Sequence, residues 1–142
     1  MCGILGITSS EYYPQKKINS FLESLNHRGP DNQGEWHNLD KGIYIGFRRL
    51  SIIDLTNASN QPMSRENTTL AFNGEIYNYQ GLRHHLKKSG VIFKTNSDTE
   101  VVLRSYIYYG LDFIKKLRGM FAIAILDKNM SEVILVRDRL GK

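Results

Sequence analysis

Apolar side chains recur at helical spacing in two segments of the chain, and a capping sequence indicates a third helix. Residues 18–25 place four of them at i, i+3, i+4 and i+7, the stripe of an amphipathic helix. Residues 79–86 repeat the pattern and are followed by two lysines and then Gly90, which is typical of a helix C-terminus. The Ser-Asp-Thr-Glu sequence at 97–100 has the spacing of a capping box, so we expect a third helix from there to near Gly110.

Other apolar segments are short or alternate with polar residues, which is typical of strands. Residues 4–7 predict a short buried strand in which glycine permits close backbone approach. Residues 42–47 place apolar side chains on one face of a second strand. Between these strands, a loop rich in turn-forming residues at 27–32 follows the first helix.

The second half of the chain combines strands with helices. Residues 68–72 predict a strand that leads into the Asn-Gly pair at 73–74, which readily adopts turn geometry with positive φ. Residues 121–126 and 133–136 predict two further strands, joined by a polar turn over 127–131. Adjacent strands with short connections favour antiparallel sheets with helices packed outside, so we expect an α+β layered domain.

The composition is that of an ordinary globular protein. Of the 142 residues, 41% are hydrophobic and 23% are charged. No apolar run approaches the ~18 residues that a membrane span needs, so we expect no membrane partner. The start of the chain lacks the pattern of a secretion signal. A single cysteine excludes an internal disulfide and suits a reducing compartment, so we expect a cytoplasmic protein.

The net charge of +5 does not indicate a nucleic-acid partner, because the lysines and arginines are scattered and are not interleaved with aromatic residues. The four histidines do not indicate a metal site either. His84 and His85 are adjacent on a predicted helix and point apart, and the other two lie far away in sequence. We therefore expect neither nucleic acid nor metal at this protein.

The lone cysteine, Cys2, directly follows the initiator methionine. Removal of Met1 would give one residue both a thiol and a free α-amine. The ordinary pKa values of a thiol and an α-amine, ~8.5 and ~7.7–8.0, are close, so proton transfer between them costs little. A base with a pKa near the working pH suits general-base catalysis. The alternative is a buried cysteine that packs as a small hydrophobic residue.

A series of short motifs runs along the whole chain. They are Met1-Cys2-Gly3-Ile4, Arg28-Gly29-Pro30-Asp31, Gly46-Phe47-Arg48-Arg49-Leu50-Ser51-Ile52, Gln61-Pro62-Met63, Phe72-Asn73-Gly74-Glu75-Ile76-Tyr77-Asn78, Ser97-Asp98-Thr99-Glu100, Gly119-Met120-Phe121-Ala122 and Arg137-Asp138-Arg139. One triplet alone would carry little weight. In this order and at these spacings, the set resembles the glutamine amidotransferase domain of the asparagine synthetase family, a class II amidotransferase with an N-terminal nucleophile.

The resemblance implies an αββα sandwich of the N-terminal nucleophile hydrolase type, with antiparallel sheets flanked by helices. Residues 1–142 would form one glutamine amidotransferase domain. In the family this domain continues past the Arg-Asp-Arg motif into further strands. We therefore expect the domain to be incomplete at its C-terminus, with an unpaired strand edge that favours aggregation.

The resemblance also assigns the chemistry, with glutamine as the substrate. Cys2 would attack the side-chain amide carbon of glutamine, and its own α-amine would take the thiol proton. The side-chain amide of Asn73 and the backbone N–H of Gly74 would face the tetrahedral oxyanion. Water would then resolve the thioester and leave glutamate and ammonia.

Further residues would bind the substrate. By the same resemblance, Arg49 would grip the α-carboxylate of glutamine, which suits a planar guanidinium. Asp98, with Glu75 nearby, would receive the α-ammonium. The backbone of four consecutive residues would line the pocket: Leu50, Ser51, Ile52 and Ile53.

Each candidate also has a purely structural interpretation. The Asn-Gly pair at 73–74 taken alone is better explained as a hairpin turn. Arg49 can form a surface ion pair, and Asp98 can complement the dipole of the helix that it begins. The joint pattern favours the functional interpretation of these residues. We interpret the other polar motif residues as helix caps or loop supports: Ser97, Glu100, Arg28 and Asp31.

The family also implies a synthetase domain as partner, supplied in cis or in trans. This chain has no Gly-x-x-x-x-Gly-Lys loop and no Ser-Gly-Gly loop for phosphate, so we expect no cofactor here and assign ATP and Mg²⁺ to that domain. Ammonia would pass to it for amidation of aspartate or a related carboxylate. A homodimer is compatible with the family.

Two other functions stay open at this point. The chain can be a catalytically inert fragment that keeps the motifs of the fold, and a retained Met1 would favour this because it blocks the amine. A nucleic-acid-binding module would have only the net charge in its favour.

Overall fold

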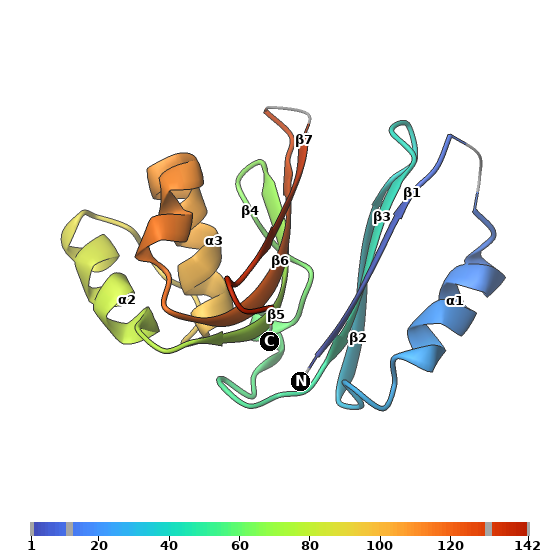
Figure 1. Cartoon of the computed structure of the whole chain (residues 1–142), viewed down its shortest axis with the longest axis horizontal. Helices are drawn as coiled ribbons and strands as arrows, with labels where there is room; N and C mark the ends of the chain where they lie inside the picture. The colour runs from blue at the N-terminus through green and yellow to red at the C-terminus, as the bar shows by residue number, and fades with distance from the viewer. Residues whose placement is uncertain (1, 11–12, 130–131, 142) are drawn as a thin grey trace.

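Two antiparallel sheets lie face to face between helices, which gives the four layers visible in Figure 1. The first sheet has the strand order β1-β3-β2, and α1 covers its outer face. The bounds of these elements are β1 Gly3–Thr8, α1 Gln15–Ser24, β2 Asn32–Asn38 and β3 Ile43–Arg49. The computed structural model describes residues 2–10, 13–129 and 132–141.

The second sheet has the order β4-β5-β6-β7, with every neighbouring pair antiparallel. Its strands are β4 Met63–Arg65, β5 Thr68–Ile76, β6 Gly119–Asp127 and β7 Glu132–Arg137. The long central strands β5 and β6 pair with each other over nine residues, so they form the centre of this sheet.

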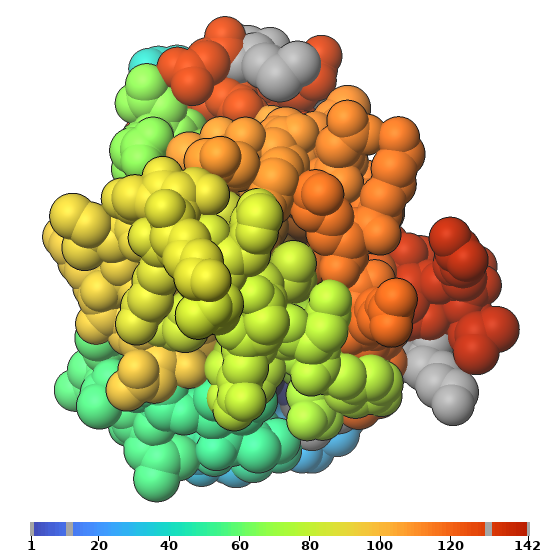
Figure 2. Space-filling view, turned by 90° about the vertical axis from the view of Figure 1, so that its left-hand side faces the viewer, coloured from blue at the N-terminus to red at the C-terminus, as the bar shows by residue number. Residues whose placement is uncertain are grey.

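Helices α2 (Tyr79–Lys88) and α3 (Asp98–Tyr109) cover the outer face of the second sheet. Figure 2 shows this helical face, with α2 in yellow-green and α3 in gold to orange. Two 3₁₀ segments complete the fold, one at Asn57–Ser59 and one at Gly110–Lys116, directly after α3. None of the helices in the described part of the chain is both long and apolar enough to cross a membrane.

Three apolar clusters hold these layers together. The largest joins α3 and the segment after it to β5 and β6. A second lies between the two sheets, where Phe47 of β3 meets Ala71 of β5 and Ala124 of β6, and Cys2 packs against its margin. The third joins Ile18 and Leu22 of α1 to Tyr44 of β3. The nucleophile candidate therefore lies at the edge of the core between the sheets.

The expected α+β sandwich of antiparallel sheets and outer helices is confirmed. The first two helices lie where apolar spacing predicted them, and α3 begins at the predicted capping box and ends at Gly110, with φ 57°. The polar turn predicted over 127–131 includes residues 130 and 131, which lie outside the described residues.

The sequence analysis predicted neither β2 nor β4. In β2 the sequence is Asn-Gln-Gly-Glu-Trp-His-Asn, and Trp36 is its only large apolar residue. The strand forms because β3 offers an aligned partner, with pairs running from Asn32 opposite Arg49 to Asn38 opposite Ile43. β4 has only three residues, too few for a periodic pattern.

The prediction of a turn at 73–74 is wrong. β5 continues to Ile76, and Asn73 and Gly74 pair with Ala122 and Phe121 of β6. Gly74 has a φ of 151°, and a Cβ there would lie only 2.1 Å from the carbonyl oxygen of Met120. Glycine at this position therefore serves the close approach of β6 and the unusual backbone angle, without reversing the chain.

Candidate active site

Cys2 lies half-buried just before β1 begins. Its Sγ accepts a hydrogen bond from the backbone N–H of Leu50 at 3.3 Å and donates to the carbonyl oxygen of the same residue at 3.6 Å. The thiol is thus held at one end of the loop that follows β3. Met1 lies outside the described residues, so the structure describes only the thiol part of the predicted nucleophile and base pair.

The loop between α1 and β2 supports this position. Arg28 Nε donates to the carbonyl oxygen of Cys2 at 3.1 Å. Asp31 Oδ2 accepts from the backbone N–H of Ser51 at 2.7 Å, and its own N–H donates to the carbonyl of Arg49 at 3.0 Å. The two residues interpreted as loop supports therefore fix the nucleophile and the start of the pocket loop together.

A pocket opens beside Cys2 and brings nine of the ten predicted site residues together. These are Cys2, Arg49, Leu50, Ile52, Ile53, Asn73, Gly74, Glu75 and Asp98. Ser51 does not line it. Four further residues line the pocket without a predicted site role, although each lies in one of the motifs that carry the resemblance: Gln61, Phe72, Thr99 and Met120.

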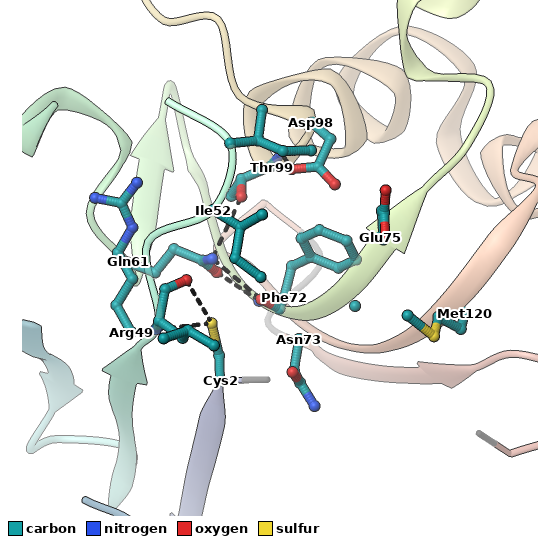
Figure 3. Close-up of a pocket in the computed structure, with 13 residues that line it drawn as sticks. Cys2, Arg49, Ile52, Gln61, Phe72, Asn73, Glu75, Asp98, Thr99 and Met120 are labelled. Carbon is teal, nitrogen blue, oxygen red and sulfur yellow. Dashed lines mark hydrogen bonds between the residues drawn. The ribbon is translucent and has the colours of Figure 1, made fainter. Parts of the chain in front are cut away.

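Asn73 lies on β5 on the side of the pocket opposite Ile52, with Cys2 beside it (Figure 3). Gly74 follows it on β5 and also lines the pocket. Among the described residues, the side-chain amide of Asn73 makes no hydrogen bond, although its oxygen is buried. A buried amide without a partner costs free energy. This amide is therefore available to a ligand that enters the pocket.

Arg49 is buried, with 5% of its surface exposed, and its guanidinium holds the loop that follows it. Nη1 donates to the carbonyl of Thr56 at 3.1 Å and to Oδ1 of Asn60 at 2.7 Å, while Nη2 donates to the carbonyl of Asp54. An exposed ion pair, the structural alternative for this residue, does not describe these contacts. Arg49 organises the loop and lines the pocket at once.

Asp98 and Glu75 lie at the other end of the pocket from Cys2 in Figure 3. Asp98 begins α3, and its carboxylate accepts hydrogen bonds from the backbone N–H groups of Ile76 at 3.3 Å and Thr99 at 2.9 Å. Burial raises the pKa of Asp98, these two hydrogen bonds oppose the rise, and the charge of Glu75 adds to it. A buried carboxylate of this kind favours a cation beside it.

Glu100 differs from its predicted role. Ser97 caps α3 as expected, because its Oγ accepts from the N–H of Glu100 at 3.2 Å. The Glu100 carboxylate accepts instead from the N–H groups of Lys94 and Thr95, at 2.9 and 2.6 Å, and from Arg65 Nε at 3.2 Å. The interpretation as a simple cap is therefore wrong, since this fully buried side chain anchors the loop before α3.

The surroundings of Glu100 also set its ionisation. Burial raises its pKa, but hydrogen bonds from Thr95 and Lys94 and the charge of Arg65 outweigh burial and hold the pKa below its ordinary value. Two carboxylates in the first turn of one helix thus have pKa values shifted in opposite directions. Within the described ranges, no group of three or more His, Cys, Asp or Glu side chains could hold a metal ion.

Comparison with known proteins agrees with this arrangement. The chain matches the glutamine amidotransferase domain family over residues 1–142. It is 43% identical over 148 residues to glutamine-hydrolyzing asparagine synthetase 1 of Bacillus subtilis (strain 168). This match covers 99% of this chain and 23% of that protein. Glutamine-hydrolyzing asparagine synthetase 1 of Arabidopsis thaliana is 38% identical over 146 residues, with 99% and 24% covered.

A solved structure shares the fold. The glutamine phosphoribosylpyrophosphate amidotransferase of B. subtilis, complexed with ADP and GMP, superposes with a TM-score of 0.78 at 26% identity, over 97% of this chain and 37% of that one. The chain spans under a quarter of the length of the two asparagine synthetases it matches. By its whole-length match and its fold, the chain belongs to the glutamine amidotransferase domain family and is homologous to one part of the glutamine-hydrolysing asparagine synthetases.

Proposed function

We propose that this chain hydrolyses glutamine to glutamate and ammonia, with Cys2 as the nucleophile. The observation that carries the proposal is that the only cysteine of the sequence lines one pocket with the uncommitted amide of Asn73, with Gly74 and with the buried carboxylate of Asp98. A nucleophile, donors for an oxyanion and a site for an α-ammonium are the groups that hydrolysis of this amide requires.

Binding of glutamine uses the two charged ends of the pocket. The α-ammonium lies against Asp98 and Glu75, where it compensates the charge that burial makes costly. The α-carboxylate faces Arg49. A guanidinium has five N–H donors, and three of them are engaged within the described residues. The remaining two can donate to the carboxylate.

In the first half of the reaction, loss of Met1 leaves the α-amine of Cys2 free to take the proton of its thiol. The N–H of Leu50 orients the sulfur. Sulfur then attacks the amide carbon, a C–S bond forms, and the carbonyl electron pair moves to oxygen, where Asn73 and Gly74 donate hydrogen bonds. The amine returns the proton to the amide nitrogen, the C–N bond breaks, and ammonia leaves.

In the second half, water attacks the thioester, with the α-amine as base. The C–S bond breaks, glutamate is released, and the sulfur regains its proton. Every atom of glutamine and of one water molecule appears in glutamate and ammonia, so the reaction consumes no oxidant or reductant.

We further propose that the ammonia serves an ATP-dependent synthetase that amidates aspartate or a related carboxylate. The support is the homology to part of two proteins named as glutamine-hydrolyzing asparagine synthetases. We assign ATP and Mg²⁺ to that synthetase, because this sequence has no phosphate-binding glycine-rich loop.

The test of the hydrolase proposal is the intact mass of the purified chain before and after incubation with 6-diazo-5-oxo-L-norleucine, a glutamine mimic that alkylates such thiols. We expect loss of the methionine mass, then one covalent adduct that Cys2→Ser abolishes, together with release of glutamate from glutamine. Retained methionine, or a processed chain that neither takes the adduct nor releases glutamate, would make the inert fragment the better description.

A further inference from the structure

Gln61 has no role in the mechanism above, yet it is one of the most constrained polar residues of the pocket. Its side chain lines the pocket with Asn73, Gly74 and Asp98, and only 5% of its surface is exposed. A buried amide needs hydrogen-bond partners, and the identity of these partners indicates its purpose.

The amide of Gln61 pairs with the backbone of Phe72. Nε2 donates to the Phe72 carbonyl at 3.0 Å, and Oε1 accepts from the Phe72 N–H at 2.6 Å (Figure 3). The ladder between β4 and β5 ends where Met63 lies opposite Leu70. Two further steps in the same register place Gln61 opposite Phe72. Because Pro62 has no N–H to donate, the Gln61 side chain continues the hydrogen bonding beyond the end of the strand.

The two hydrogen bonds between the Gln61 side chain and the Phe72 backbone form a clamp on β5. Phe72 lies directly before the two residues that would face the oxyanion. On one side of β5, Asn73 and Gly74 are paired with β6. On the other side lies the pocket, and the last described hydrogen bonds before it are those between Gln61 and Phe72. The position of Asn73 and Gly74 relative to Cys2 therefore depends on the fixing of Phe72.

The same amide reaches the ammonium-binding end of the pocket. Nε2 also contacts Oγ1 of Thr99 at 3.3 Å, and Thr99 follows Asp98 in the first turn of α3. Asn60, the residue before Gln61, accepts a hydrogen bond from the Arg49 guanidinium. One side chain thus connects the strand of the oxyanion donors with the helix turn of Asp98, next to the loop held by Arg49.

The backbone of Gln61 is itself braced by the other sheet. Its carbonyl oxygen lies so close to β2 that a Cβ on Gly34 would come within 1.9 Å of it. Glycine at 34 permits this contact. The clamp is consequently anchored on the sheet that carries Cys2 and acts on the sheet that carries Asn73.

We propose that Gln61 is a positioning residue that sets the distance between the nucleophile and the oxyanion donors. The kinetic test of this role rests on the proposed hydrolysis of glutamine. The role depends on a side chain at this position that offers both a donor and an acceptor to the backbone of Phe72, which an amide does at every working pH.

The first test is Gln61→Met, which keeps the length of the side chain and removes both hydrogen-bonding groups. We expect kcat for glutamine hydrolysis to fall about tenfold to a hundredfold, the range typical of a misplaced reacting group, with a smaller rise in KM. Alkylation by 6-diazo-5-oxo-L-norleucine should slow in parallel, whereas alkylation by iodoacetamide, which needs only the thiol, should not. Unchanged kcat would overturn the proposal.

Tyr106→Phe is the matched control. It removes a buried hydrogen bond to Asp127, 2.7 Å long, in the core between α3 and β6 and outside the pocket. We expect this variant to lose stability and retain kcat. If it loses kcat as much as Gln61→Met does, general loosening of the core explains both and the positioning role is wrong.

Gln61→Glu adds a pH signature. When protonated, the introduced carboxyl can donate to the Phe72 carbonyl and accept from its N–H; when ionised, it only accepts. The kcat of this variant relative to the parent should therefore rise as pH falls, while the ratio for Gln61→Met stays flat. The other charged or titratable side chains that line the pocket, Cys2, Arg49, Glu75 and Asp98, are the same in the parent and in both variants, so the flat ratio expected for Gln61→Met controls for them. A flat ratio for both variants would contradict the clamp.

Hydrogen exchange separates this inference from the proposed function. In Gln61→Met, the backbone amides of Phe72, Asn73 and Gly74 should exchange faster than in the parent, relative to those of β6, whether or not the parent hydrolyses glutamine. A parent without glutaminase activity would refute the proposed function alone. Unaltered exchange at Phe72 would refute the clamp alone.

Discussion

The two sheets contribute to the pocket in different ways. The first sheet and its loops contribute Cys2 and Arg49, and both contact mainly backbone groups. The thiol lies between the N–H and the carbonyl of Leu50, and the guanidinium contacts the carbonyls of Asp54 and Thr56. The side chains that support this half, Arg28 and Asp31, are half-buried and exposed, so substitution there should disturb the fold less than substitution in the core.

The second sheet contributes Asn73 and Gly74, and α3, which covers that sheet, contributes Asp98. Buried side chains hold the segments that carry these residues. Gln61 fixes the strand of the oxyanion donors, and Glu100 fixes the loop that leads into the helix of Asp98. A side chain can be lost by one substitution. The oxyanion and ammonium sites should therefore be the fragile half of the pocket, and the nucleophile the robust half.

The largest effect is expected at the nucleophile. Cys2→Ala removes the only atom that can form the thioester, so glutamine hydrolysis should fall to background. Glutamine affinity should stay close to that of the parent, because the binding groups lie elsewhere in the pocket. Glutamate release and titration calorimetry measure the two quantities, and turnover comparable to the parent would refute the assignment.

The next effect concerns the oxyanion. Asn73→Ala should lower kcat by about 10²–10³-fold, the cost of losing one donor of this type, roughly 2.7–4 kcal/mol. Because the Asn73 amide makes no hydrogen bond within the described residues, the free energy of unfolding should barely change. A kinetic assay beside a denaturant melt tests both. A large loss of stability would instead make Asn73 a residue of the sheet core.

Glu100→Gln tests the fragile half through its support. Loss of the charge beside Arg65 and Arg104 should destabilise the fold by about 3 kcal/mol, as breaking a buried ion pair does. The lowered pKa of Glu100 stabilises the folded parent above the ordinary pKa of a glutamate, near 4.5, and this contribution is lost as pH falls through the lowered folded value. Melts of parent and variant should therefore converge in acid, and equal stability at neutral pH would contradict the anchor.

Asp98→Asn should have a smaller effect on stability. Burial raises the pKa of Asp98, so its ionised form opposes folding above that pKa, and the neutral variant avoids this cost. The variant has one acceptor oxygen in place of two and leaves the N–H of Ile76 or of Thr99 without a partner, so the two effects oppose each other. Affinity for glutamine should fall roughly tenfold to a hundredfold, the value of a charged hydrogen bond of about 1.5–3 kcal/mol. The parent should also lose affinity as pH falls through this raised pKa, and the variant should not. Equal affinities would leave Asp98 as a helix-end charge.

The contrast between the two halves also explains what could be predicted from the sequence. The fold class, the three helices and nine lining residues follow from local spacing and from motifs with a known order. The contacts of Glu100 and Gln61 could not be predicted from the sequence. They are made to backbone groups, such as those of Lys94 and Phe72, that come close to these side chains only in the folded chain.

Backbone geometry escaped prediction for a similar reason. The Asn-Gly pair at 73–74 has the local preference of a turn, but β6 offers a partner along its whole length and the strand continues. β2 lacks an apolar pattern, and pairing with β3 supplies what its own sequence does not. In each case pairing with a partner strand, distant in sequence for β5 and next along the chain for β2, outweighed the local preference.

The tight contact at Gly74 also determines how the oxyanion donors can be studied. Any side chain at position 74 collides with the Met120 carbonyl, so a mutational scan would show position 74 as intolerant even if its N–H never touched a substrate. Loss of activity in Gly74→Ala therefore carries no information about catalysis. Replacing the amide at this position by an ester, in a chain assembled by chemical ligation, removes the N–H and adds no side chain. That single-atom exchange reports the value of the donor itself.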